Sequence, residues 1–413
     1  MDTLKPRDAQ DVEQAVAAAI AAEQPLEIVG LGSKRAIGQP MATNALLDLS
    51  ALNAVVNYEP NELIITVQAG APLEDVLSLI DSRNQQLAFE PIDSSALLGT
   101  AAQRGSIGGM IASGLAGPRR IKAGAARDHL LGAEAVSGFG ELFKTGGKVV
   151  KNVTGYDLCK LLAGSWGTLA VMTEVTLKVM PKPEAERTLL LRGLDDVAAG
   201  RAMTAALGSP YDVSGAAHLP GSALRGAGGA LGAIGKPEQS MTLLRLEGTA
   251  TSAAHRAGSL AHLLAGYGAA ELLEDTSSAA AWAEIRDVIP FAADGPRALW
   301  PIWRIVCPPA VGGAFGQALA RDSQGEVIYD WGGGLIWAAL PPVVDANAGV
   351  LRKRVEAIGG HAMLIRAPEH TRSAVDVFHP QPAGVAALNA RVKQSFDPKH
   401  ILNRGRMVRG TAS

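Results

Sequence analysis

Residues 25–34 read Pro25-Leu26-Glu27-Ile28-Val29-Gly30-Leu31-Gly32-Ser33-Lys34, a short apolar run that passes directly into a glycine turn. The run has the length and the β-branched content of a buried strand. A strand that ends in glycines can present backbone N–H groups to a phosphate, because no side chain stands in the way. This stretch therefore predicts a strand with an anion-binding loop at its end.

Two further glycine segments, residues 105–109 and 164–168, have the same character. Each segment alone is typical of an ordinary tight turn, and a turn by itself implies no ligand. Their co-occurrence with residues 30–34 in the first part of the chain indicates a phosphate-bearing ligand held by several loops.

The sequence departs from the two most common nucleotide-binding motifs. After Gly30 and Gly32, Arg35 occupies the place of the third glycine that lets helix and strand pack closely in a Rossmann fingerprint. Residues 140–148 resemble a Walker A loop, but Leu142 replaces its first glycine and Val149 its magnesium-binding hydroxyl. A nicotinamide site of the Rossmann type and nucleotide triphosphate hydrolysis are both disfavoured.

The hydrophobic pattern around these loops mixes short strands with helices. Apolar spacing predicts a helix over residues 12–20 that ends before Pro25, and a second helix over residues 73–80. The expected strands are residues 26–29, 46–49, 55–58, 63–68 and 169–179, with a hairpin formed by residues 133–137 and 141–144. The pattern indicates an α+β fold.

The chain has 413 residues, more than one hydrophobic core usually serves, so at least two domains are expected. Pro181-Lys182-Pro183 interrupts the strand pattern and predicts a boundary. We expect a cofactor domain over residues 1–182, a cap domain over residues 183–392, and a C-terminal segment, residues 393–413, that returns to the first domain. Residues 219–236 contain few bulky side chains and are expected to form a mobile loop.

Composition excludes several functions. Thirty-eight Lys and Arg balance 40 Asp and Glu, which favours neither nucleic acid nor an anionic membrane surface and leaves a small molecule or a protein as partner. Cys159 and Cys307 are the two cysteines, too few for a disulfide framework, a zinc knuckle or an iron–sulfur cluster. We expect both to be small buried hydrophobes, in a chain of the reducing cytoplasm without a membrane span.

Several blocks together resemble a known family. Residues 25–34, 67–73, 89–91 and 105–109 resemble, in order, the PCMH-type FAD-binding domain of the vanillyl-alcohol oxidase superfamily. The most specific block, residues 146–176, is similar to the FAD-binding E subunits of glycolate oxidases.

The C-terminal residues 396–407 extend the match to nearly the whole chain, apart from residues 219–236 and parts of the second domain. The resemblance implies an FAD domain of two small α/β subdomains with the flavin between them, and an α+β cap over the isoalloxazine ring.

The resemblance also implies a function. A chain of this kind serves in the oxidation of glycolate, a small 2-hydroxyacid, to glyoxylate, with electrons passed through flavin to an iron–sulfur subunit, beside a sister FAD-binding subunit. Any membrane contact comes through these partners. The residues expected to bind FAD are Gly30, Leu31, Gly32, Ser33, Lys34, Pro91, Gly105, Ser106, Ile107, Gly108, Gly109, Lys151, Asn152, Gly155, Asp157, Gly164, Gly167, Thr168 and Val171.

Two departures from the family pattern change the expectation. Members with covalent flavin carry a histidine in the first glycine loop, where this chain has Ser33 and Lys34, so FAD is expected to be non-covalent. Arg404 replaces a proline of the C-terminal motif, which leaves the returning segment less rigid.

The chemistry of 2-hydroxyacid oxidation requires a cation for the carboxylate and a group that takes the hydroxyl proton. The candidates in the cap are Arg304, Trp337 and Arg366. His361, His370 and His379 recur every nine residues, which does not align them on a helix face, so no metal site is expected.

Three functional alternatives remain. Substrate oxidation could occur mainly on the sister subunit, with this chain contributing an electron-transfer flavin. A flavin-free assembly subunit is a second alternative, disfavoured because an unused phosphate cradle is free to acquire side chains. The third is a self-sufficient flavin oxidoreductase for another 2-hydroxyacid.

Overall fold

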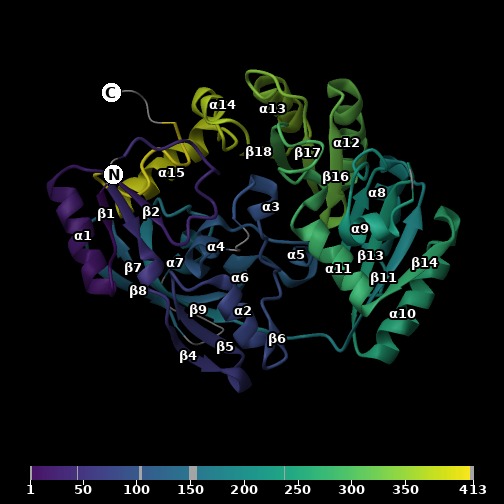
Figure 1. Cartoon of the computed structure of the whole chain (residues 1–413), viewed down its shortest axis with the longest axis horizontal. Coiled ribbons are helices and arrows are strands. Elements are labelled where there is room, and N and C mark those ends of the chain that lie inside the picture. The colour runs from purple at the N-terminus through teal and green to yellow at the C-terminus, as the bar shows by residue number, and fades with distance from the viewer. Residues whose placement is uncertain (1, 44, 102–104, 148–155, 237, 410–413) are drawn as a thin grey trace.

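The computed structural model describes residues 2–43, 45–101, 105–147, 156–236 and 238–409. Its two halves lie side by side, residues up to Pro181 in one and the green and teal segments in the other, and the C-terminal helix returns to the first half (Figure 1). The mixture of helices with mainly antiparallel sheets confirms the predicted α+β class.

The chain begins with a three-stranded parallel sheet in the order β1-β3-β2. Its elements are β1 (Asp2–Leu4), α1 (Ala9–Ala21), β2 (Leu26–Val29) and β3 (Ala45–Asp48). Asp8 caps α1 by accepting a hydrogen bond from the Asp11 N–H, and Val12, Val16 and Ala19 form the buried side of the helix. The predicted helix and the first two predicted strands are confirmed.

A five-stranded antiparallel sheet in the order β4-β5-β9-β7-β8 supports the rest of the first half. Its strands are β4 (Val55–Glu59), β5 (Ile64–Gln68), β7 (Leu130–Ser137), β8 (Leu142–Gly146) and β9 (Ala170–Lys178). The predicted β7–β8 hairpin and the long strand β9 are confirmed, and seven of the nine residues of β9 are buried because the strand lies in the middle of the sheet.

Short helices connect and cover these strands. They are α2 (Leu73–Asp81), α3 (Ser95–Leu98), α4 (Ile107–Ser113), α5 (Arg120–Ala123), α6 (Ala126–His129) and α7 (Leu158–Leu162). The two-residue strands β6 (Gln85–Gln86) and β10 (Met180–Pro181) pair with each other just before the chain crosses to the second half.

The second half is built on one eight-stranded sheet in the order β14-β11-β13-β12-β16-β17-β15-β18, with antiparallel neighbours throughout. The strands are β11 (Ala185–Arg192), β12 (Val213–Leu219), β13 (Met241–Gly248), β14 (Ala270–Glu274), β15 (Ile302–Val306), β16 (Glu326–Asp330), β17 (Leu335–Ala339) and β18 (His361–Arg366). The main helices are α8 (Asp196–Leu207), α10 (Ala250–Leu263), α11 (Asp275–Arg286), α12 (Pro309–Ser323) and α13 (Ala348–Ala357).

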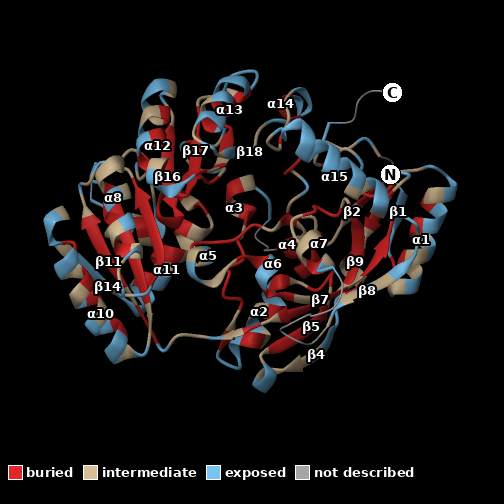
Figure 2. Ribbon diagram, turned by 180° about the vertical axis from the view of Figure 1, so that it is seen from behind, coloured by how far each residue is buried: buried red, intermediate tan, exposed pale blue. Residues whose placement is uncertain are grey.

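The two faces of this sheet have different neighbours. On one face, Trp303 and Ile305 of β15 are buried with residues of α12 and α13. The alternate residue Ile302 belongs to a cluster that also contains Ile37 and Trp166 of the first half. The sheet therefore presents one face to its own helices and the other to the first half, and buried segments run through the contact between the halves (Figure 2).

The C-terminal segment ties back to the first half, as Figure 1 shows for α15. After α14 (Glu369–Ala374) and α15 (Ala383–Phe396), Leu402 pairs with Leu26 of β2. The ammonium of Lys393 donates to the carbonyl of Thr168 at 2.5 Å and to the carboxylate of Asp397. The boundaries at residues 182 and 392 remain a prediction about domain organisation.

Residues 219–236 are not the mobile loop that their composition predicts. They include α9 (Gly229–Ile234), and Ala223 and Leu231 are completely or almost completely buried. The Glu284 carboxylate accepts hydrogen bonds from the Ala230 and Leu231 N–H groups at 2.6 and 2.9 Å. Residues with small side chains are buried here because their backbone packs closely against the core. The cap of α9 is supplied by Glu284, which is distant in sequence.

Cys159 and Cys307 are buried and unpaired, which confirms that they pack as small hydrophobes. Among the described helices, none combines the length and the apolar character needed to cross a bilayer.

Candidate functional site

A pocket opens in the first half where the three glycine segments meet. Its open space amounts to about 710 Å³, part of which is continuous with solvent. It is lined by Ile28, Val29, Gly30, Leu31, Gly32, Ser33, Lys34, Arg35, Leu49, Ala69, Ser106, Gly108, Gly109, Ala112, Ser113, Trp166, Gly167, Ala170, Met172, Asn403 and Arg406. Nine of the residues predicted for the cofactor are among them.

Glycine is required where these loops approach one another. A Cβ at Gly30 would lie 2.0 Å from Ser106 Oγ, and one at Gly108 would lie 2.8 Å from the Ala69 carbonyl oxygen. A Cβ at Gly105, which has φ +85°, would lie 2.2 Å from Ser33 Oγ. Side chains at these positions would push the loops apart and fill the cradle.

The first loop offers backbone donors to the pocket. Gly32 takes the left-handed conformation at φ +73°, and within the described parts of the chain no group accepts a hydrogen bond from the N–H groups of Gly32 and Ser33. Consecutive backbone N–H groups in such a turn form a concave site for an anion. The arrangement suits a pyrophosphate.

Lys34 adds a cation beside the backbone donors of this loop. Its ammonium lies 3.3 Å from Ser33 Oγ and lines the pocket. Burial lowers the pKa of Lys34 to about 8, an effect that the carboxylate of Asp93 opposes. A buried ammonium of this kind is stabilised by an anion that enters the pocket.

The C-terminal segment supplies residues that were missing from the predicted site. Asn403 accepts from the Ile28 N–H at 2.7 Å and donates to the Trp166 carbonyl at 2.8 Å. Arg406 donates to the Lys34 carbonyl at 2.8 Å, while its buried Nε has no acceptor among the described residues. The C-terminal motif that contains them is visible in the sequence. Only folding brings Asn403 next to Ile28 of β2, 375 residues earlier in the chain.

Other residues predicted for the cofactor do not line this pocket. Ile107 and Val171 are fully buried in two hydrophobic clusters, and Asp157 caps α7 by accepting from the Lys160 N–H. Pro91, Gly105, Gly164 and Thr168 also lie outside the lining. Lys151, Asn152 and Gly155 lie outside the described residues. Contacts of all these residues with a cofactor remain predictions.

The comparisons with known proteins agree with this geometry. The profile of the FAD binding domain matches residues 3–146. The glycolate oxidase subunit GlcE of Escherichia coli (strain K12) is 31% identical over 396 residues, 94% of each chain. This chain belongs to the family of the glycolate oxidase subunit GlcE.

Other relatives of the GlcE-family chain match more narrowly. The glycolate oxidase subunit GlcD of Bacillus subtilis (strain 168) is 32% identical over 45% of this chain and 38% of its own length. A solved alkyldihydroxyacetonephosphate synthase shares the fold, with a TM-score of 0.68 over 97% of this chain and 76% of its own, at 15% identity. The cofactor of the GlcE-family chain is FAD, and the chain is an FAD-dependent oxidoreductase acting on CH–OH groups.

The second half places the three predicted catalytic residues differently. Trp337 and Arg304 are direct neighbours across β17 and β15, but Trp337 is buried in the core. Arg366 donates to the backbone carbonyls of four residues in separate segments, Leu97, Phe291, Arg297 and Trp300. Arg366 thus holds segments of both halves together, whereas Arg304 has no such acceptor among the described residues.

Among the described residues, no group of three metal-ligating side chains occurs. His361 lies two residues from Met363 along β18, on the face that carries Arg304. Burial, followed by Arg304 and His379, lowers the pKa of His361, so the imidazole is neutral at pH 7.

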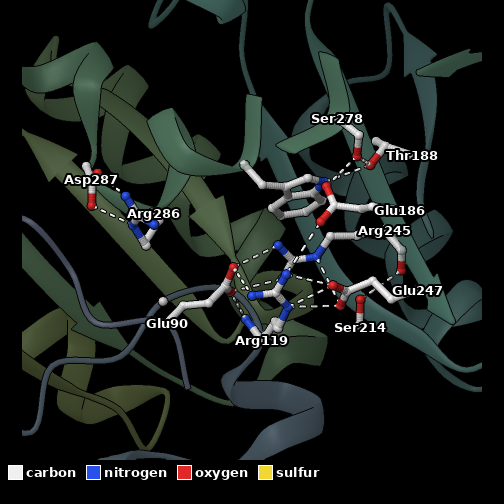
Figure 3. A network of polar contacts seen from close by, with 12 residues as sticks. Glu90, Arg119, Glu186, Thr188, Ser214, Arg245, Glu247, Ser278, Arg286 and Asp287 are labelled. Atoms are coloured by element: carbon white, nitrogen blue, oxygen red, sulfur yellow. Dashed lines mark hydrogen bonds and ion pairs between the residues drawn. The ribbon is translucent and has the colours of Figure 1, made fainter. Parts of the chain in front are cut away.

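A buried ionic network joins the halves beside this face (Figure 3). The Glu90 carboxylate accepts from both terminal nitrogens of Arg245 at 2.9 and 3.0 Å and from the Arg119 N–H at 2.6 Å. Arg119 also pairs with Glu247 at 2.6 Å and Glu186 at 3.4 Å. Glu90 and Arg119 belong to the first half and the other three to the sheet, so the network fixes their contact.

Proposed function

We propose that this chain binds FAD non-covalently and serves in the oxidation of a small 2-hydroxyacid of the glycolate class, as one subunit of a glycolate oxidase complex. The glycine cradle with Lys34 at its rim carries the proposal, because it fits a dianionic pyrophosphate in a chain similar to GlcE along nearly its whole length.

Each part of the pocket has a role in holding the cofactor. The Gly32 and Ser33 N–H groups and the Lys34 ammonium would hold the pyrophosphate, while Ala69, Ala112 and Met172 line the pocket with apolar atoms. Non-covalent binding follows from Ser33 and Lys34, which stand in place of an attachment histidine. FAD, when bound, supplies the acceptor for the two electrons of the alcohol.

The products and partners follow from the same proposal. Glycolate would yield glyoxylate, and the electrons would leave through an iron–sulfur subunit, with a sister FAD-binding subunit in the complex. Cys159 and Cys307 lie in different halves and are both buried, so these two cysteines do not assemble a cluster on this chain. We place the complex in the cytoplasm, with any membrane contact made through the partners.

The test is the visible absorption spectrum of the purified chain, alone and co-expressed with the two partner subunits, before and after acid precipitation. Yellow FAD in the acid supernatant, and bleaching by glycolate under anaerobic conditions, are the expected results. A protein that is colourless in every context would instead be an assembly subunit. Colour that stays in the precipitate would show a covalent flavin.

A further inference from the structure

Arg304 stands apart from the other arginines of the described chain. Every other described arginine that is buried or half-buried donates to a carboxylate or a carbonyl. Arg304 is half-buried, yet it has no such acceptor among the described residues, and its Nε is completely enclosed. A partly desolvated guanidinium without an anion costs free energy unless a ligand supplies one.

A second arginine is directed at the same place. The guanidinium of Arg304 lies 5.0 Å from the ring centre of Trp331, and that of Arg120 lies 4.5 Å from it. Trp331 is almost fully buried and held by its indole N–H, which donates to the Gly117 carbonyl at 3.0 Å. One indole therefore holds two cations from opposite halves of the molecule.

The surroundings leave this positive charge uncancelled. Asp330, an acid that acts electrostatically on Arg304, is buried and accepts a hydrogen bond from the Trp331 N–H at 2.7 Å. Burial raises the pKa of Asp330 to about 7, so it carries only part of a charge at neutral pH. Neighbouring Arg119 has three carboxylates in the network of Figure 3, which fixes the segment that carries Arg120.

We propose that Arg120 and Arg304, which both approach the Trp331 ring, form the binding site for the carboxylate of the substrate. The assignment rests on the proposed function for its choice of anion. Arg120 is exposed, which gives a small anion access from solvent, and Arg304 lies on the sheet face that packs against the flavin-binding half. Two guanidinium groups provide the planar donors that carboxylates prefer.

The test uses the full chain with its partner subunits and compares Arg304→Gln and Arg120→Gln with Arg201→Gln, an exposed arginine of α8. Substrates are glycolate and its neutral amide, glycolamide, with a dye acceptor. Both site variants are expected to retain FAD and to raise the KM for glycolate by at least about tenfold, while the KM for glycolamide stays unchanged. Arg304→Lys should recover part of the loss.

Unchanged glycolate KM in both site variants, or an equal rise for glycolamide, would overturn the site. Loss of the partner subunits from the purified complex, with glycolate KM unchanged, would identify the pair as a docking surface instead. If the wild-type complex oxidises no 2-hydroxyacid, the proposed function fails and calorimetry with oxalate tests the site separately. Oxalate binding that both variants lose would sustain a carboxylate site, and no binding to the wild type would refute it.

Discussion

Lys34 shows how a single buried cation can make cofactor binding depend on pH. Its pKa of about 8 is set first by burial and is partly restored by Asp93. An anion in the pocket raises that pKa, so binding of FAD takes up a proton at pH values between the pKa of the free chain and that of the complex. The chain with protonated Lys34 is therefore expected to bind FAD more tightly than the chain with neutral Lys34.

We therefore expect the dissociation constant of FAD to be flat below pH 7 and to increase as the pH rises through about 8. Lys34→Met should weaken binding by roughly tenfold to a hundredfold, the equivalent of about 1.5–3 kcal/mol for a charge-assisted hydrogen bond, and should abolish the pH dependence. Flavin fluorescence titrations at pH 6 to 10 measure both effects. An identical pH profile in the variant would show that another group titrates.

Two substitutions of Gly32 distinguish the effect of backbone strain from the effect of charge in the first glycine loop. At φ +73° every L-residue is strained, although a Cβ there meets only Arg35 atoms at 3.6 Å or more. Gly32→Ala should cost about 1 kcal/mol and reduce FAD affinity only modestly, because the cradle stays open. Gly32→Asp adds an anion beside the pyrophosphate and should abolish binding.

Flavin stoichiometry of the two purified variants distinguishes these effects. Retention of stoichiometric FAD by Gly32→Asp would remove this loop from the proposed phosphate site.

A helix whose sequence has little hydrophobic periodicity and no capping residue depends on side chains that are distant in sequence. Helix α9 has no side-chain cap of its own, and its first N–H groups donate to Glu284 of α11. Glu284→Ala should destabilise the helix end by about 1 kcal/mol, the typical value for loss of a cap. Limited proteolysis should then cut residues 226–236 faster, whereas FAD content should remain that of the wild type.

Glu62→Ala is the matched control, since Glu62 is exposed in the short 3₁₀ helix Pro60–Glu62 between β4 and β5, in the first half of the molecule. Equal cleavage rates in the wild type and Glu284→Ala would mean that residues 226–236 are mobile in spite of the cap.

At the scale of the whole molecule, the two halves are joined by buried ion pairs. Arg245 is 1% exposed, pairs with Glu90 and lies 4.6 Å from the ring centre of Trp282. Removing one partner of such a buried pair leaves an uncompensated charge. Arg245→Met should lower the free energy of unfolding by about 3–5 kcal/mol, and the double variant Arg245→Met, Glu90→Leu should recover part of it.

Denaturant unfolding followed by far-UV circular dichroism provides the measurement. Arg321→Gln, which breaks an exposed pair with Asp322, is the control and should change stability by about 1 kcal/mol or less. Similar losses in Arg245→Met and Arg321→Gln would show that the network contributes nothing beyond a surface pair.

Much of the first half could be read from the sequence. Strand β2, the β7–β8 hairpin, strand β9 and the glycine loops follow from local periodicity and turn chemistry, which operate over a few residues. Nine of the predicted cofactor residues line the pocket, since the glycines that let these loops approach one another are visible in the sequence.

The sequence by itself determined the α+β class, the glycine loops that line the pocket and the family, because these depend on local patterns and on similarity along the chain. The tertiary structure alone decided what was distant or ambiguous. Asn403 and Arg406 complete the pocket, and residues 219–236 fold around Glu284. Arg366 binds backbone carbonyls, while Arg304 and Arg120 both approach the Trp331 ring. The sequence does not show whether an arginine forms hydrogen bonds with a carboxylate or a carbonyl, because only the folded chain determines which oxygen atoms lie near its guanidinium group.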